Sequence, residues 1–179
     1  MTPVEQRSLT WKEALEVYGK PQVITMLFLG FSAGLPFLLV FSTLTVFLFE
    51  SGITRSTIGF FSWIGITYSI KVFWAPVVDS VRLPVLHHFL GQRRSWILLG
   101  QTGIAVGLMA IAVTDPVPNT LLLACFGLLV AFSSATQDIS IDAYRIESAV
   151  PKFQAAMSAA YVFGYRLALL VAGAGALYL

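Results

Sequence analysis

A run of 27 residues without a charged side chain, from Val23 to Phe49, constrains the fold of this chain more than any other feature. An α-helix needs ~20 apolar residues to cross the ~30 Å hydrocarbon core of a bilayer, so this run is long enough to span a membrane. Further apolar segments follow at residues 57–78, 95–113, 120–144 and 155–179. We therefore predict an all-α bundle of five transmembrane helices, at residues 23–49 and at these four later ranges.

The composition supports a membrane protein and excludes several other classes. Hydrophobic residues make up 57% of the 179 residues and charged residues only 11%, whereas a soluble domain has roughly 25% charged residues. The formal net charge of +2 is too small to indicate nucleic-acid binding. Cys125 is the single cysteine, and His87 and His88 have no acidic or cysteine ligands beside them, so we expect neither a disulfide framework, nor a metal, nor a cofactor.

Residues 1–22 precede the first apolar run and have a helical pattern of their own. Thr10 and Glu13 form a capping box, and apolar residues follow at helical spacing until Gly19 and Pro21 end the pattern. We predict a short amphipathic helix that lies on the cytoplasmic face of the membrane.

The orientation of the bundle follows from its basic residues. Eight of the 11 lysines and arginines fall on one side of the predicted membrane, namely Arg7, Lys12, Lys20, Arg82, Arg93, Arg94, Arg145 and Lys152. The positive-inside rule then places the N-terminus and these loops in the cytoplasm. The fifth helix would end on the outer side without a polar tail after Leu179, so we expect the chain to be the first part of a longer protein.

Small residues mark two predicted helix contacts. Gly103 and Gly107 form a G-x-x-x-G pattern in the third helix. In the fifth helix small residues recur at every fourth position, namely Ala160, Gly164, Ala168, Ala172 and Ala176. We expect both faces to pack closely against neighbouring helices.

Charged residues interrupt three of the predicted helices, and these are the candidate functional residues. An α-helix rises ~1.5 Å per residue, so Asp138, Lys71 and Arg166 lie ~9, ~10 and ~15 Å from the cytoplasmic ends of their own helices. The three charges are therefore expected in one layer. Arg166 is about 200° around its helix from Gly164 and is therefore expected to point into the bundle. The stem of Lys71 is also long enough to snorkel out of the membrane.

This layer has two interpretations. It is either a static ion-pair cluster that fixes helix packing, or the wall of a wet path in which cations attract an anionic solute and an acid takes up a proton. Ser134, Asp138, Asp142 and Arg145 share one helix face. Asp142 lies nearer the interface, where we expect a local cap or gate with Arg145 and Lys152.

Several segments, taken in order and spacing, resemble the major facilitator superfamily and more closely the AmpG-type muropeptide permeases. They are GFSAGLP (30–36), TIGFFSWIG (57–65), KVFWAPVVD (71–79), GQRRSW (91–96), SSATQDISIDAYR (133–145) and GYRLALLVAGAGAL (164–177). Asp79, Gly91, Arg93 and Arg94 are similar to the superfamily motif between the second and third helices, in a stretched form. The resemblance covers almost all of the five predicted helices.

The resemblance implies a twelve-helix carrier with two lobes, of which this chain holds five helices of the first. It implies import of anhydro-muropeptides across the bacterial inner membrane by proton symport, for peptidoglycan recycling and β-lactamase induction. Lys71 and Arg166 suit the carboxylates of such a cargo, and Gln137, Tyr161 and Tyr165 suit its sugar or amide groups. Asp79, Arg93 and Arg94 would latch the cytoplasmic side.

Three other functions remain open at this point. A related carrier of another solute, such as an acetyl-CoA-like molecule or a siderophore, would share the first lobe. A non-transporting membrane scaffold would use static ion pairs. A membrane-embedded enzyme is disfavoured, because the H-E-x-x-H pattern is absent and the two histidines lie far from Asp138 in depth.

Overall fold

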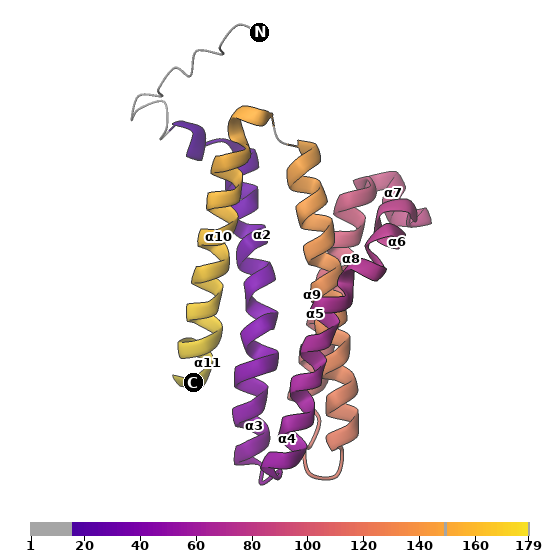
Figure 1. Ribbon diagram of the computed structural model, residues 1–179, viewed down its shortest axis with the longest axis vertical. Helices are drawn as coiled ribbons and strands as arrows, with labels where there is room; N and C mark the ends of the chain where they lie inside the picture. The colour runs from indigo at the N-terminus through magenta and orange to yellow at the C-terminus, as the bar shows by residue number, and fades with distance from the viewer. Residues whose placement is uncertain (1–15, 149, 179) are drawn as a thin grey trace, which may run out of the picture.

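The computed structural model describes residues 16–148 and 150–178, and the regular structure of these residues is entirely helical (Figure 1). The predicted all-α class is therefore confirmed. Four helices are long and apolar enough to cross a membrane, at Pro21–Glu50, Gln92–Ala112, Thr120–Ser148 and Gln154–Gly175. The capping box predicted at Thr10 and Glu13 lies outside the described residues.

The first span is continuous but contains a widened turn. It consists of α2 (Pro21–Leu38), a π-helical turn η1 (Leu39–Thr43) and α3 (Leu44–Glu50). Pro36 lies inside α2 and has no N–H to donate, which favours a local change of helix winding just beyond it. In the widened turn, the Thr43 hydroxyl donates to the Ala172 carbonyl oxygen at 3.2 Å, which ties the first span to the fifth.

The second span is divided into short pieces, where the sequence predicted one helix over residues 57–78. These pieces are α4 (Arg55–Phe61), the 3₁₀ turn η2 (Ser62–Gly65), α5 (Ile66–Ile70), the 3₁₀ turn η3 (Lys71–Phe73) and α6 (Ala75–Ser80). Pro76 explains the second interruption, because it cannot donate to the Val72 carbonyl and its ring disfavours helical geometry in the residue before it. The break falls beside Lys71, one of the candidate functional residues.

A further short helix occupies the segment between the second and third spans, which the sequence analysis treated as a loop. This helix is α7 (Pro84–Leu90), with Pro84 in its first turn and Gly91 as its C-cap residue. Gly91 has a φ of 77°, a conformation that residues with a Cβ rarely adopt. The glycine of the superfamily-like motif therefore has a backbone reason to be there, because it lets α8 begin at Gln92.

The long helices are arranged as two tightly packed pairs. In Figure 1, α2 runs beside α10 (Gln154–Leu170), and α8 (Gln92–Ala112) runs beside α9 (Thr120–Ser148). α2 and α9 join the two pairs, and α5 and α6 of the second span pack on α9. The fifth span begins with the 3₁₀ turn η4 (Pro151–Phe153) and continues past α10 through a π-helical turn, η5 (Val171–Gly175), and α11 (Ala176–Tyr178).

Two glycines let α2 and α10 approach until their backbones touch. A Cβ on Gly30 would collide with the Tyr161 carbonyl oxygen, and a Cβ on Gly164 would collide with the Leu27 carbonyl oxygen. Ala160, Gly164, Ala168 and Ala172 are all buried, which confirms the small-residue seam predicted for the fifth helix. Gly107 packs on Val130 in the same way, where an added Cβ would lie 2.6 Å from Val130 Cγ2.

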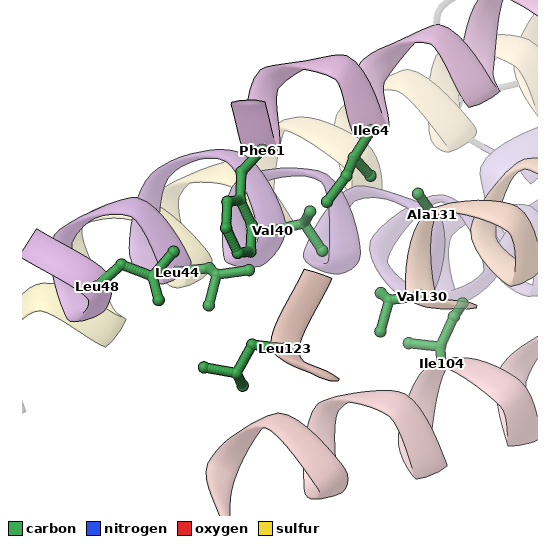
Figure 2. Packing of buried hydrophobic residues seen from close by; sticks show 9 residues of the cluster. All are labelled: Val40, Leu44, Leu48, Phe61, Ile64, Ile104, Leu123, Val130 and Ala131. Carbon is green, nitrogen blue, oxygen red and sulfur yellow. The ribbon is translucent and has the colours of Figure 1, made fainter. Parts of the chain in front are cut away.

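The apolar core consists of two clusters at opposite ends of the bundle. Figure 2 shows the cluster that joins η1 and α3 to α4, η2, α8 and α9, formed by Val40, Leu44, Leu48, Phe61, Ile64, Ile104, Leu123, Val130 and Ala131. The second cluster contains Val17, Val23, Met26, Ala33, Ile97, Ile141, Met157 and Ala160. On α9 the first cluster ends at Ala131 and the second begins at Ile141. The stretch of helix between them contributes to neither cluster and can carry polar residues.

The backbone contact between α2 and α10 predicts that adding a single methyl group at its glycines strongly lowers stability. We expect Gly164→Ala to lower the free energy of unfolding by about 1–3 kcal/mol, because the added methyl group has to push the two helices apart. The matched control is Gly59→Ala in α4, where a Cβ would have nothing within 4 Å. Thermal unfolding in detergent, followed by circular dichroism, measures both variants. Equal melting temperatures for the two would show that the close approach does not contribute to stability.

Candidate functional site

A polar layer lies between the two apolar clusters, and α9 provides most of it. Its buried polar side chains on α9 are Ser133, Ser134, Thr136, Gln137 and Ser140. Such a run inside a membrane-spanning helix is costly unless each group finds a partner in the bundle or water in a cavity. The layer is therefore the place to look for function.

Part of this layer is a junction of three helices. The Gln137 side chain is fully buried, and its Nε2 donates to the Ser32 hydroxyl oxygen at 3.2 Å. Gln101 on α8 donates to the same oxygen, also at 3.2 Å. The junction connects α2 to α8 and α9 in the zone between the two apolar clusters, so Gln137 forms the inner wall of the site and not its surface.

Lys71 and Asp138 form an ion pair within this layer. The Lys71 Nζ lies 3.6 Å from Asp138 Oδ2, and the two side chains are 35% and 18% exposed. The other carboxylate oxygen, Asp138 Oδ1, is buried and has no hydrogen-bond partner among the described residues. The pair thus neutralises the charges and leaves one strong acceptor unoccupied.

Tyr68 on α5 packs against two aromatic rings of the first span. The Tyr68 hydroxyl is buried without a hydrogen-bond partner among the described residues. The Tyr68 ring lies 5.9 Å from that of Phe37 and 6.0 Å from that of Phe41, between ring centroids. Tyr68 precedes Lys71 by three residues, so both project from the same side of the second span.

Arg166 does not join the ion pair. Its side chain is exposed, and it forms no salt bridge with any acid in the described part of the chain. It lines an open depression of about 450 Å³ on α10 with Tyr161, Val162, Tyr165 and Leu169. The two tyrosine rings lie 6.3 Å apart between centroids. The expected layer of three charges is therefore assembled as one pair and one separate cation.

The predicted cytoplasmic latch is built around Arg93 at the start of α8. Its guanidinium contacts Asp79 Oδ1 at the end of α6, at 2.5 Å, and Glu147 Oε1 near the end of α9, at 2.7 and 2.9 Å. Gln92 reinforces the contact by donating to the Asp79 carbonyl oxygen. Arg93 thus ties the ends of three helices together with one planar cation.

The other predicted gate residues have different surroundings. Asp142 and Arg145 form an ion pair of 3.2 Å along one face of α9, as their spacing predicts. Arg94 is exposed and forms no ion pair with the acids that the structure describes. It lines a pocket of about 400 Å³ with Leu90, Ile97, Gln101 and Tyr144, among others.

Sequence reasoning missed several residues of the site. Glu147 was not assigned to the latch, although its position near the end of a helix, opposite a basic segment, was a usable signal. Ser32 and Gln101 gave no signal, because a single hydroxyl or amide in an apolar run does not indicate its partner. Trp74 was also missed, and its contacts are described below.

Comparison with known proteins gives one family match and several relatives. Residues 22–119 match the family model described as acetyl-coenzyme A transporter 1. Putative transporter AmpG 4 of Rickettsia conorii is 38% identical over 164 residues, which cover 92% of this chain and 39% of that protein. The anhydromuropeptide permease of Escherichia coli is 36% identical over 165 residues, covering 92% of this chain and 33% of that protein.

A third relative, putative transporter AmpG 3 of Rickettsia prowazekii, is 37% identical over 165 residues, covering 90% of this chain and 39% of that protein. The chain therefore spans between about one third and two fifths of the length of these relatives. All three are transporters or permeases, not enzymes. No solved structure matches significantly.

The latch geometry predicts unequal roles for two neighbouring arginines. We expect Arg93→Ala to lower the free energy of unfolding by about 1 kcal/mol, because it removes both ion pairs of the latch. Arg93→Lys should lie between the parent and this variant, since an ammonium cannot reach two carboxylates with the same fork geometry. Arg94→Ala is the matched control and should stay within about 0.5 kcal/mol of the parent. The same loss in both alanine variants, measured by thermal unfolding in detergent, would contradict the latch.

Proposed function

We propose, from the premise that this chain belongs to the acetyl-coenzyme A transporter family of major facilitator carriers, that it forms the first five membrane-spanning segments of a solute permease. The cargo that we propose is an anhydromuropeptide, imported with a proton. The permease named for this cargo in Escherichia coli supports the choice, because the aligned part of it is 36% identical to 92% of this chain.

The observation that carries the proposal is the ion pair of Lys71 and Asp138. A charge inside an apolar span has a high free-energy cost, and a purely structural contact is made more cheaply by apolar side chains of similar volume. Both members of the pair remain partly exposed, and Asp138 keeps one oxygen without a hydrogen-bond partner among the residues that the structure describes. An exchangeable pair of this kind suits a site at which a proton binds Asp138 and an anionic solute then binds Lys71.

The proposed cycle follows from this exchange of partners. With Asp138 ionised, its carboxylate holds the Lys71 ammonium. Protonation of Asp138 neutralises the carboxylate and frees Lys71 to bind a carboxylate of the cargo, and loss of the proton on the other side restores the pair and releases the cargo. Cargo and proton therefore move in the same direction.

Other residues contribute to the proposed path according to their positions. Arg166, Tyr161 and Tyr165 lie on the open face of α10, where a cation and two hydroxyls suit a sugar-peptide acid. Gln137 is buried beneath the ion pair and supports the wall of the path. The remaining helices of the complete carrier would close the opposite side.

The proposed orientation places the N-terminus and the latch in the cytoplasm. It rests on the excess of lysine and arginine on that side of the membrane. The gate then consists of Asp79, Arg93 and Arg94 between the second and third spans, with Asp142 and Arg145 at the end of α9. We place the carrier in the inner membrane of a bacterium, where the imported fragments would feed peptidoglycan recycling and β-lactamase induction.

An acetyl-CoA-like cargo is the second candidate, because the matching family model carries that description. The two cargoes differ in chemistry, since one is a sugar-peptide carboxylic acid and the other a nucleotide thioester rich in phosphate. Uptake of each labelled compound by proteoliposomes that contain the complete carrier, with and without an uncoupler, distinguishes them. Accumulation of the muropeptide that the uncoupler abolishes supports the first proposal, and uptake of acetyl-CoA alone would replace it.

A set of variants in the complete carrier separates transport from packing. We expect Asp138→Asn and Lys71→Met each to reduce muropeptide uptake at least tenfold. The Lys71→Met/Asp138→Asn double variant removes both charges, so it should reach the membrane in normal amounts, as replacements of buried ion pairs by neutral residues often do. It should nevertheless fail to transport. Glu50→Gln, at the exposed end of α3, is the control.

The double variant also decides between this proposal and a scaffold. Restored uptake in the double variant would mean that the pair only holds helices together. Undiminished uptake in both single variants would remove Lys71 and Asp138 from the path altogether. Membrane levels, measured by immunoblotting, have to be compared in every case.

Arg166 is expected to act on cargo affinity and not on protein stability, because its exposed side chain has no ion-pair partner in the described part of the chain. Arg166→Ala should raise the KM for muropeptide uptake about tenfold, while Arg166→Lys keeps the charge and retains most of the affinity. Concentration series of uptake measure both. A KM unchanged by Arg166→Ala would exclude contact between Arg166 and the cargo.

A further inference from the structure

The interruption in the second span raises the question of what fixes Lys71 in place. Lys71 begins the 3₁₀ turn η3, and this turn ends at Trp74, whose backbone N–H donates to the Lys71 carbonyl oxygen at 3.3 Å. Trp74 has φ −105° and ψ −2°, outside ideal helical values. A long flexible side chain on an irregular turn next to Pro76 has many possible positions. Its pairing with Asp138 therefore needs a support from outside the turn.

The Trp74 side chain provides a contact of this kind with α9. Its indole Nε1–H donates to the Thr136 hydroxyl oxygen at 3.2 Å. Its ring packs on Phe132, with ring centroids 4.8 Å apart and an interplanar angle of 32°. Trp74 thus grips α9 through one polar contact and one aromatic contact.

The geometry of Thr136 gives the polar contact a direction. The Thr136 hydroxyl donates its own proton to the Phe132 carbonyl oxygen at 2.8 Å, one turn earlier on α9. Its only hydrogen is thereby used, and its lone pairs remain to accept the indole N–H. Thr136 is buried, so water does not compete freely for this acceptor.

The ion pair of Lys71 and the hydrogen bond of Trp74 involve neighbouring residues both on the irregular turn and on α9. Lys71 and Trp74 are three residues apart, and their partners Asp138 and Thr136 are two residues apart. We propose that Trp74 and Thr136 are a positioning pair, which holds the turn η3 so that the Lys71 ammonium stays at the Asp138 carboxylate. The consequence for transport rests on the function proposed above, but the positioning itself does not.

The variants follow from the contact. Thr136→Val removes the acceptor with little change of shape, whereas Thr136→Ser keeps the hydroxyl. Trp74→Phe keeps an aromatic ring against Phe132 and removes the N–H. The matched control is Trp63→Phe, since Trp63 is on the same span and is 68% exposed.

The first measurement is the rate at which acetic anhydride acetylates Lys71 in the complete carrier, determined by peptide mass spectrometry with the exposed Lys20 as an internal reference. A lysine held against a carboxylate reacts slowly, because the reagent reaches its nitrogen only when the contact opens. We expect Thr136→Val, Trp74→Phe and Asp138→Asn each to raise this rate about threefold to tenfold, because loss of one hydrogen bond shifts an equilibrium by about this factor. Thr136→Ser and Trp63→Phe should match the parent.

Non-additivity makes this measurement specific for positioning. If Trp74 and Thr136 act through the ion pair, adding Thr136→Val to Asp138→Asn should give no further rise in the acetylation rate. Parental Lys71 rates in both Thr136→Val and Trp74→Phe would overturn the inference. So would a full additional rise in the double variant, because Trp74 would then act independently of Asp138.

The second measurement is muropeptide uptake, which also tests the function proposed above. A positioning role predicts a higher KM in Thr136→Val and Trp74→Phe, about threefold to tenfold, with rescue by Thr136→Ser. A purely structural role lowers only the amount of folded carrier, and hence the maximal rate. Absence of uptake by the parent would overturn the proposed function while the acetylation rates still decide the positioning. A raised acetylation rate with an unchanged KM would separate the pair from cargo binding.

Discussion

The contact between Lys71 and Asp138 is the constraint that explains most of the surrounding structure. Each group alone would be an uncompensated charge within apolar spans, and together they form a neutral pair 3.6 Å apart. For this pair to form, the second span must approach α9, and the helix must be opened at Lys71 to aim its side chain. Pro76 supplies that opening, at the cost of backbone hydrogen bonds that a straight helix would make.

The polar layer around the pair is possible because the apolar contacts are concentrated elsewhere. The two hydrophobic clusters hold the ends of the bundle, and the backbone contact at Gly30 and Gly164 holds α2 to α10. The middle of α9 is therefore not needed for apolar packing and can carry polar side chains. Gln137 and Gln101 use this freedom to meet at Ser32, which gives the layer a fixed wall.

The sequence was sufficient for the helical class and for the small-residue seam of the fifth span, and it placed Lys71 and Asp138 in one layer without deciding whether they pair. These properties follow from periodicity, charge cost and spacing, which are local or nearly so. The break in the second span was not predicted, because an apolar run with one proline reads as one helix until its neighbours are known. Glu147 and Trp74 were missed because their partners, Arg93 and Thr136, are more than 50 residues away in the chain.

The second span differs from the others in the contacts that hold its final part, from Lys71 to Asp79, to the bundle. α2 and α10 touch through glycines and small side chains, and α8 packs on α9 through Gly107. From Lys71 onward, by contrast, directional polar contacts at Asp138, Thr136 and Arg93 hold the second span, together with the packing of Trp74 on Phe132. Apolar contacts between close-packed helices do not respond to charge, whereas ion pairs and hydrogen bonds do. A change in protonation or in bound anion therefore acts first on the segment from Lys71 to Asp79, while the close-packed pairs stay as they are.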